Sequence, residues 1–184
     1  MTAATETRTP DAAPALRGLY FVRFGFAVVW AGLLALTASD LGVAAGVLLV
    51  VYPLFDVAAA VVDARTTRAR ELLLNIVISS AAAIGLVFAA TSGIPSVLRV
   101  WGAWAVLAGV VQLVVALRRR GLGGQWPMIL SGGISVLAGG SFIAMASQAG
   151  ASLTSLAGYA TIGGIFFLVS AIRLGRAART AEGR

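Results

Sequence analysis

The stretch RVWGAWAVLAGVVQLVVALRRR, residues 99–120, decides the fold. Between Arg99 and Arg118 lie 18 consecutive uncharged residues. As a helix rising about 1.5 Å per residue they extend roughly 27 Å, close to the thickness of the hydrocarbon core of a bilayer, so the stretch predicts a membrane span. Three arginines end it, and arginine clusters indicate the cytoplasmic side because they resist translocation and attract anionic lipid.

The composition places the whole chain in the integral membrane class. Of its 184 residues 59% are hydrophobic and only 11% are charged, whereas in soluble domains about a quarter are charged. The apolar runs are continuous rather than alternating, which predicts helices and not a barrel. The chain contains no histidine and no cysteine, which excludes thiol chemistry, disulfides and most zinc sites. We therefore expect no catalytic residue, no metal and no cofactor.

An uncharged run with an arginine-rich exit recurs along the chain. After Arg120 the next charge is Arg173, and the 52 residues between them fit two spans joined by the polar break SQAGAS at 147–152. The predicted fold is all-α: a polytopic membrane protein with six transmembrane helices in three sequential hairpins. The predicted spans are 19–38, 41–62, 72–90, 96–117, 125–146 and 153–172. They form a domain at 17–175, preceded by a disordered tail at 1–16 and followed by a basic tail at 176–184.

Arginine placement predicts the orientation. The chain has a net charge of +7, and its fourteen basic residues are all arginines, thirteen of which fall on one side of the predicted topology, with Arg99 on the other. This bias predicts that both termini are cytoplasmic, in agreement with an even number of spans. Such placement indicates topology signals and contacts with anionic headgroups, not nucleic-acid binding. The expected lipid contacts are Arg118, Arg119, Arg120, Arg173 and Arg176.

The three hairpins show a weak internal repeat. Each ends in three residues that include an alanine and finish with an arginine, at 63–65, 116–118 and 171–173. A shift of 55 residues brings Gly109 onto Gly164, and a shift of 56 brings Ile78-Ser79 onto Ile134-Ser135. These matches predict a tandem two-helix repeat in which successive hairpins have the same orientation.

Three segments carry a resemblance to a known family: ILSGGISVLAGG (129–140), WGAWAVLAGVVQLVVALRRR (101–120) and GYATIGGIFFLVSAIRLGR (158–176). The pattern resembles the HdeD-like family of bacterial short-repeat membrane proteins, whose domain is of unknown function. The resemblance covers spans three to six more closely than spans one and two. It implies a six-helix protein of the bacterial inner membrane and, through the member that gives the family its name, a link to acid resistance.

Asp56 lies well inside the second span, and Arg23 lies at a similar depth in the first. A charge in hydrocarbon costs about 2.5 kcal/mol or more unless it is paired or hydrated, so we expect an ion pair between them. A fixed structural pair and a proton-transfer site are both consistent with this pattern. Four further side chains complete a predicted polar layer in the inner-leaflet third of the membrane: Asn75, Gln112, Ser131 and Ser135. Interhelical hydrogen bonds explain such a layer, and a half-channel is the alternative.

Small and aromatic residues predict how the spans pack. Small residues spaced four apart permit close approach of helices in lipid. The glycines expected at such contacts are Gly42, Gly46, Gly109, Gly139 and Gly164. Trp101, Trp104 and Trp126 lie near span ends and are expected as interfacial anchors, while Trp30 is deeper and is expected to pack inside.

On this basis we expect a non-enzymatic inner-membrane protein of the HdeD type. It would support envelope or acid-stress tolerance through helix packing and through self-association or partner contacts, with membrane lipids and a homo-oligomer as the expected partners. The alternative is a small channel or proton-coupled carrier that uses Asp56 and the polar layer. A hydrated cavity at Asp56 would favour the carrier, and helices closed tightly around it would favour the structural pair.

Overall fold

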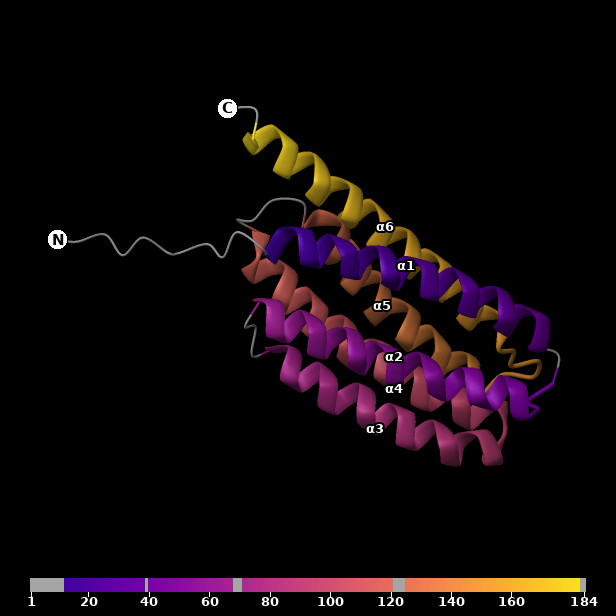
Figure 1. Ribbon diagram of the computed structural model, residues 1–184. Coiled ribbons are helices and arrows are strands. Elements are labelled where there is room, and N and C mark those ends of the chain that lie inside the picture. Colours follow the sequence, from indigo (N-terminus) through magenta and orange to yellow (C-terminus); the bar gives the residue numbers. More distant parts are fainter. Residues whose placement is uncertain (1–11, 39, 68–70, 121–124, 183–184) are drawn as a thin grey trace.

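The computed structural model describes residues 12–38, 40–67, 71–120 and 125–182, and the regular structure within these ranges is helical (Figure 1). The helices are α1 (Ala12–Thr37), α2 (Val43–Thr67), α3 (Glu71–Ser92), α4 (Ile94–Arg118), α5 (Trp126–Met145) and α6 (Thr154–Glu182). Each of the six is long and apolar enough to cross a membrane. The predicted all-α fold with six spans is therefore confirmed.

The outer helices are longer than predicted. α1 begins at Ala12, so the expectation of a disordered tail is wrong for residues 12–16, where Leu16 is buried. Residues 1–11 of that predicted tail lie outside the described residues. α6 continues to Glu182 and so includes most of the predicted basic tail. Its 29 residues extend about 43 Å, more than a bilayer core requires. In Figure 1 its C-terminal turns project past the neighbouring helices.

The breaks between spans follow the predicted signals. A single residue, Gly93, separates α3 from α4, and its φ of 98° lies in the region that glycine adopts most readily. Pro95 follows in the first turn of α4, where its missing N–H costs no helical hydrogen bond. Gly150, with φ 89°, lies in the longer connection between α5 and α6.

The helices pack in chain order, and α6 packs against α1, so the contacts close a ring. Each returning helix, α2, α4 or α6, contacts the first helix of the next hairpin more extensively than its own hairpin partner. The tightest packing therefore lies between the predicted hairpins rather than within them. A tandem repeat whose units are placed around a common axis would give this arrangement.

The closest helix contact is between α4 and α5, where backbone meets backbone. A Cβ atom added to Gly139 would lie 2.5 Å from the carbonyl oxygen of Gly102, and one added to Gly109 would lie 2.8 Å from that of Gly132. Without side chains at these positions the two helices approach more closely than any larger residue would allow. The prediction did not include Gly102 and Gly132, which complete the contact.

The other predicted packing glycines differ in how closely atoms of neighbouring helices approach them. A Cβ on Gly164 would lie 3.1 Å from that of Ala27 on α1, which is a tight contact. A Cβ on Gly46 would make an ordinary contact with Ala90 at 3.8 Å. The prediction for Gly42 is wrong: nothing lies within 4 Å of its Cβ position, because it precedes α2 and stands in open space.

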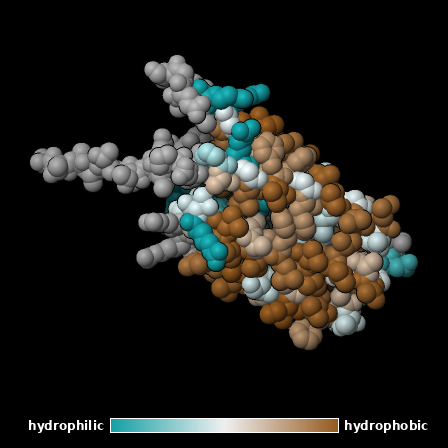
Figure 2. Space-filling model, viewed as in Figure 1, coloured by the Kyte–Doolittle hydropathy of each residue, from teal (hydrophilic) through white to brown (hydrophobic). Residues whose placement is uncertain are grey.

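Each of the six helices exposes large hydrophobic side chains, as a surface facing lipid should. Figure 2 shows hydrophobic residues across most of the visible face, with hydrophilic residues gathered near the end where α1 begins and α6 ends. We call this the arginine-rich end, because α2 and α4 also finish there, and Arg65, Arg118 and Arg119 with them. Arg99 is exposed near the opposite end, in the first turns of α4.

The interior at the opposite end is filled by aromatic and aliphatic side chains. Trp30, Tyr52, Trp101 and Trp104 form an aromatic cluster with ring centroids between 4.6 and 5.8 Å apart. Because Trp101 and Trp104 are 0% and 5% exposed, their prediction as interfacial anchors is wrong, while Trp30 packs inside as expected. α4 begins at Ile94, so both tryptophans lie two or more turns inside the bundle. Trp126 is 67% exposed at the start of α5.

Candidate functional site

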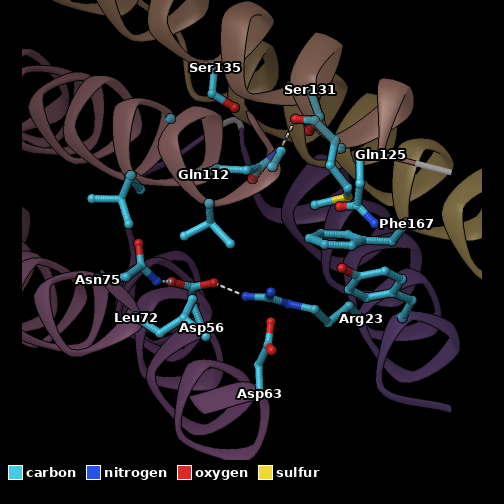
Figure 3. A pocket seen from close by; sticks show the side chains of 18 of the residues that line it. Arg23, Asp56, Asp63, Leu72, Asn75, Gln112, Gln125, Ser131, Ser135 and Phe167 are labelled. Carbon is cyan, nitrogen blue, oxygen red and sulfur yellow. Dashed lines mark hydrogen bonds and ion pairs between the residues drawn. The ribbon is translucent and has the colours of Figure 1, made fainter. Parts of the chain in front are cut away.

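Arg23 on α1 and Asp56 on α2 form the predicted ion pair. The guanidinium Nη2 of Arg23 donates to Oδ1 of Asp56, and the two side chains are 12% and 15% exposed. Figure 3 shows the two groups pointing toward each other across the space between their helices. Asp56 lies eleven residues before the end of α2, about 16 Å along the helix, and so near the middle of that helix. It is deeper than the predicted inner-leaflet third, because α2 continues five residues past the predicted end of the span at 62.

The second oxygen of Asp56 is held by α3. Asn75 Nδ2 and Ser79 Oγ each donate to Oδ2 at 2.8 Å. Ser79 in turn accepts a hydrogen bond from Trp104 Nε1 at 2.9 Å, which connects the carboxylate to the aromatic cluster. Ser79 was not among the predicted residues, although it follows Asn75 by four positions and therefore lies on the same helix face.

Arg23 is held on a second side by an aromatic ring. Its guanidinium carbon lies 4.7 Å from the centroid of Phe167 on α6, a cation–π contact. The carboxylate of Asp56 and the face of Phe167 therefore bind one guanidinium between α2 and α6, as Figure 3 shows. Sequence reasoning missed Phe167 because phenylalanine in an apolar span is not distinguishable from a lipid-facing residue.

These groups border a cavity of about 100 Å³ at the centre of the bundle. All six residues of the predicted polar layer line it: Arg23, Asp56, Asn75, Gln112, Ser131 and Ser135. A water molecule needs only about 10–15 Å³ of such a volume, so the cavity has room for several waters or one solute of a few heavy atoms. The predicted layer is therefore the wall of an internal space rather than a set of closed contacts.

The remaining polar residues of the layer are only partly engaged. Gln112 Nε2 donates to the carbonyl oxygen of Met128 at 3.0 Å, and Tyr159 donates to Ser135 Oγ at 2.9 Å. Ser131 is 5% exposed and lines the same cavity. Gln112 and Ser135 thus link helices, as interhelical hydrogen bonds would, and they still border the cavity.

A second ion pair borders the same cavity nearer the arginine-rich end. Arg119 Nη2 lies 3.2 Å from Asp63 Oδ1 and donates to Thr67 Oγ1 at 2.6 Å. The side chains of Arg119 and Asp63 are 11% and 6% exposed, so the prediction of Arg119 as a lipid-headgroup contact is wrong. The reason is that α2 continues to Thr67, which keeps Asp63 inside the bundle as the partner of Arg119.

Arg118, one residue earlier, behaves as an exposed arginine. It pairs with Glu71 at the start of α3, and its side chain is 69% exposed. Arg120 and Arg173 are also exposed, as is Arg176. Their contact with anionic headgroups stays a prediction.

The cavity residues fall at equivalent positions of the predicted repeat. A shift of 56 residues relates Arg23 to Ser79 and Ser79 to Ser135, and the same shift relates Asp56 to Gln112. A further 55 residues lead from Gln112 to Phe167. Each of these residues lines the cavity or bonds to Asp56. The pairs Asp56 with Ser79 and Phe167 with Arg23 each join one hairpin to the next.

The cavity ends at the aromatic cluster. Tyr52 and Trp104 line its wall on that side. Beyond them the core consists of fully buried side chains such as Leu34, Leu49 and Leu98. Within the described residues, the polar lining therefore extends from mid-membrane to Arg119 and Gln125 at the arginine-rich end, and it does not continue toward Arg99.

Comparison of the chain with protein-family models, with curated proteins and with solved structures finds no match. The chemistry of the lining itself indicates what the site can do. Two carboxylates and two guanidiniums give the lining a balanced charge, and amide, hydroxyl and aromatic groups complete it. Among the described residues there is no group of three acidic, histidine or cysteine side chains that could hold a metal ion. The arrangement suits water, a proton or a small polar solute.

Proposed function

We propose that this protein is a carrier for a small polar solute, coupled to protons, which uses Asp56 as the residue that binds in turn the solute and the proton. The observation that supports this most directly is the 100 Å³ cavity that borders Asp56 at mid-membrane. Helices closed tightly around the Arg23–Asp56 pair would have favoured a purely structural role. A polar cavity inside lipid is costly unless water or a ligand fills it, so its presence favours a functional role.

A carrier fits the interior better than a channel. A channel needs a hydrated path through the whole membrane, with polar groups at every depth. Here the aromatic cluster closes one side of the cavity, and Trp104 links that cluster to Asp56 through Ser79. A site reached from one side at a time, with a closed barrier on the other, is the arrangement that alternating access requires.

The setting that we propose is the bacterial inner membrane, with both termini in the cytoplasm. The arginine bias supports the orientation, because arginine-rich loops stay on the cytoplasmic side. The resemblance to the HdeD-like family supports a role in acid or envelope stress. A carrier that binds protons at a carboxylate reached from the cytoplasm would contribute to such tolerance. On this proposal, cells lacking the protein survive acid challenge less well and are not complemented by the Asp56→Asn variant.

Reconstituted protein tests the transport step. Liposomes containing the purified full chain, a trapped pH-sensitive dye and a trapped mixture of small polar solutes, which a coupled carrier needs in exchange for protons, are given an acid pulse outside, and the rate of internal acidification is followed. We expect the wild-type protein to accelerate acidification over empty liposomes. The Asp56→Asn variant should reduce the rate to that of empty liposomes, because an amide does not exchange the proton.

Asp40→Asn is the matched control. Asp40 is exposed at the opposite end of the bundle and lies outside the cavity, so this variant removes a carboxylate without touching the site. It should acidify at the wild-type rate. Equal rates for wild type, Asp56→Asn and Asp40→Asn would overturn the proposal and leave the ion pair with a structural role.

A further inference from the structure

We propose that Asp56 and the ring of Phe167 form a binding site for small organic cations of the guanidinium or alkylammonium class, and that Arg23 fills this site in the present state. The inference rests on the proposed function and names the substrate class of the same cavity. Its basis is that the protein already binds one guanidinium there, with a carboxylate on one side and an aromatic face at 4.7 Å on another.

Carboxylate and aromatic groups together select for cations. A carboxylate supplies the charge and accepts the N–H bonds of a guanidinium or ammonium group, and an aromatic face attracts the same group through its quadrupole. Tyr52, Trp104 and Tyr159 add further aromatic surface to the cavity wall beside Asp56. Anions would meet the carboxylates of Asp56 and Asp63, while both arginines are already paired.

The cavity has room for a small ligand. A volume of about 100 Å³ accommodates a group of a few heavy atoms, such as guanidinium, methylguanidinium or methylammonium. Because the cavity is partly open, its volume sets no sharp upper limit, and charge and aromatic contact are expected to select the ligand.

If Arg23 is displaced from Asp56, a second carboxylate in the cavity can accept its guanidinium. Asp63, which already pairs with Arg119, lies two helical turns after Asp56 on α2, and in Figure 3 its carboxylate points toward the guanidinium of Arg23. An incoming cation that takes Asp56 would release Arg23 toward Asp63 and the arginine-rich end. Arg23 thus acts as a tethered competitor, and a proton on Asp56 would release it in the same way.

Binding to the purified full chain in detergent tests the inference without any transport. Methylguanidinium chloride is titrated against the wild-type protein and binding is measured by calorimetry and by tryptophan fluorescence, since Trp104 is linked to Asp56 through Ser79. Urea, which has a similar shape but no charge, and sodium chloride at equal ionic strength are the controls. We expect saturable binding of methylguanidinium and no saturable response to urea or sodium chloride.

Two variants decide whether Arg23 occupies the same site. Arg23→Ala removes the competitor and should bind methylguanidinium about tenfold or more tightly, because apparent affinity rises as the competent state becomes the main one. Arg23→Gln, which keeps a hydrogen-bond donor, serves if the alanine variant does not fold, and it should bind more tightly than wild type. Asp56→Asn should abolish binding in either background.

The outcomes separate this inference from the proposed function. Absence of binding to the wild type, or binding that Asp56→Asn leaves intact, overturns the cation site. Binding to the Arg23 variants alone also overturns it, since Arg23 would then be a permanent internal counterion. If methylguanidinium fails to bind while Asp56-dependent acidification of liposomes persists, the carrier proposal stands and only the substrate class is wrong.

Discussion

In the half of the bundle near the arginine-rich end, the interior holds two ion pairs and a cavity. In the other half it holds three tryptophans, a tyrosine and several leucines in direct contact. The same six helices build both halves, so the difference comes from the side chains that they turn inward. The packed half can be stabilised by dispersion and close approach alone, whereas the polar half depends on each charge keeping its partner.

A single chain of hydrogen bonds connects the two halves. Trp104 belongs to the aromatic cluster and donates to Ser79, which donates to Asp56. A change in the partners of Asp56 therefore alters the hydrogen bonding of Trp104, a side chain of the packed half. The aromatic cluster is thus a barrier made rigid by packing. The cavity beside it is lined by ion pairs and hydrogen bonds whose partners can be exchanged.

Asp56→Asn should have the largest effect on stability, because it removes the carboxylate at the centre of the polar half. The variant leaves Arg23 in the membrane interior without its carboxylate, and breaking a buried ion pair from one side costs about 3–5 kcal/mol. We expect a clearly lower midpoint of thermal unfolding in detergent. The double variant Arg23→Gln with Asp56→Asn should recover a large part of the loss, because no unpaired charge remains.

Asp40→Asn again provides the control and should leave the midpoint unchanged, since Asp40 is exposed. If the double variant is no more stable than Asp56→Asn alone, the cost does not arise from an unpaired Arg23. The contrast between a polar half held by charge pairing and a packed half would then fail.

Gly139→Ala should have the next largest effect, this time in the packed half. The new Cβ would lie 2.5 Å from the carbonyl oxygen of Gly102, and neither backbone can move without separating α4 from α5. Overpacking of this kind costs about 1–3 kcal/mol. Gly140→Ala is a matched control one residue away, because nothing lies within 4 Å of its Cβ position. Thermal unfolding of the two variants in one detergent should show a large loss for the first and none for the second.

Much of this architecture was predictable from the positions of the charged residues and the lengths of the uncharged stretches between them. The six spans and the Arg23–Asp56 pair follow from the cost of placing charge in lipid, which acts on any sequence in the same way. Depth along a span can be read by counting residues from an arginine-rich end. This is why Asn75, Gln112, Ser131 and Ser135 were predicted in one layer and line one cavity.

What the sequence did not reveal is which side of each helix faces inward. In a lipid-exposed helix both faces are apolar, so periodicity no longer separates core from surface. Trp101 and Trp104 were therefore read as membrane-interface residues although they lie in the core. Arg119 was predicted to face lipid headgroups for a related reason: the sequence does not distinguish it from its neighbour Arg118. In the structure Arg118 is exposed and Arg119 is buried. Only the packing of α2 against its neighbours brings Asp63 to Arg119.

Trp104→Phe and Trp101→Phe give a smaller effect that sharpens the comparison at the boundary between the halves. Trp104 Nε1 donates to Ser79, whereas Trp101 Nε1 is one of the buried side-chain atoms without a partner among the described residues. Losing the first bond should cost about 1 kcal/mol, while removing an unsatisfied N–H offsets part of the lost packing at Trp101. We expect Trp104→Phe to be the more destabilising in thermal unfolding and to change the acidification rate of liposomes. Equal effects on that rate would contradict a link through Ser79.

Arg118→Gln should have the smallest effect, because its pair with Glu71 lies outside both interior regions. The Arg118 side chain is 69% exposed, and exposed ion pairs contribute about 0–1 kcal/mol, an amount that salt reduces further. Thermal unfolding at low and at high salt should therefore differ little between this variant and the wild type. Arg119→Gln, one residue along, removes a guanidinium that is 11% exposed and leaves Asp63 buried without its ion-pair partner. A loss for Arg118→Gln as large as that for Arg119→Gln would mean that burial does not separate these two neighbouring pairs, and the distinction between the cavity wall and its surroundings would no longer hold.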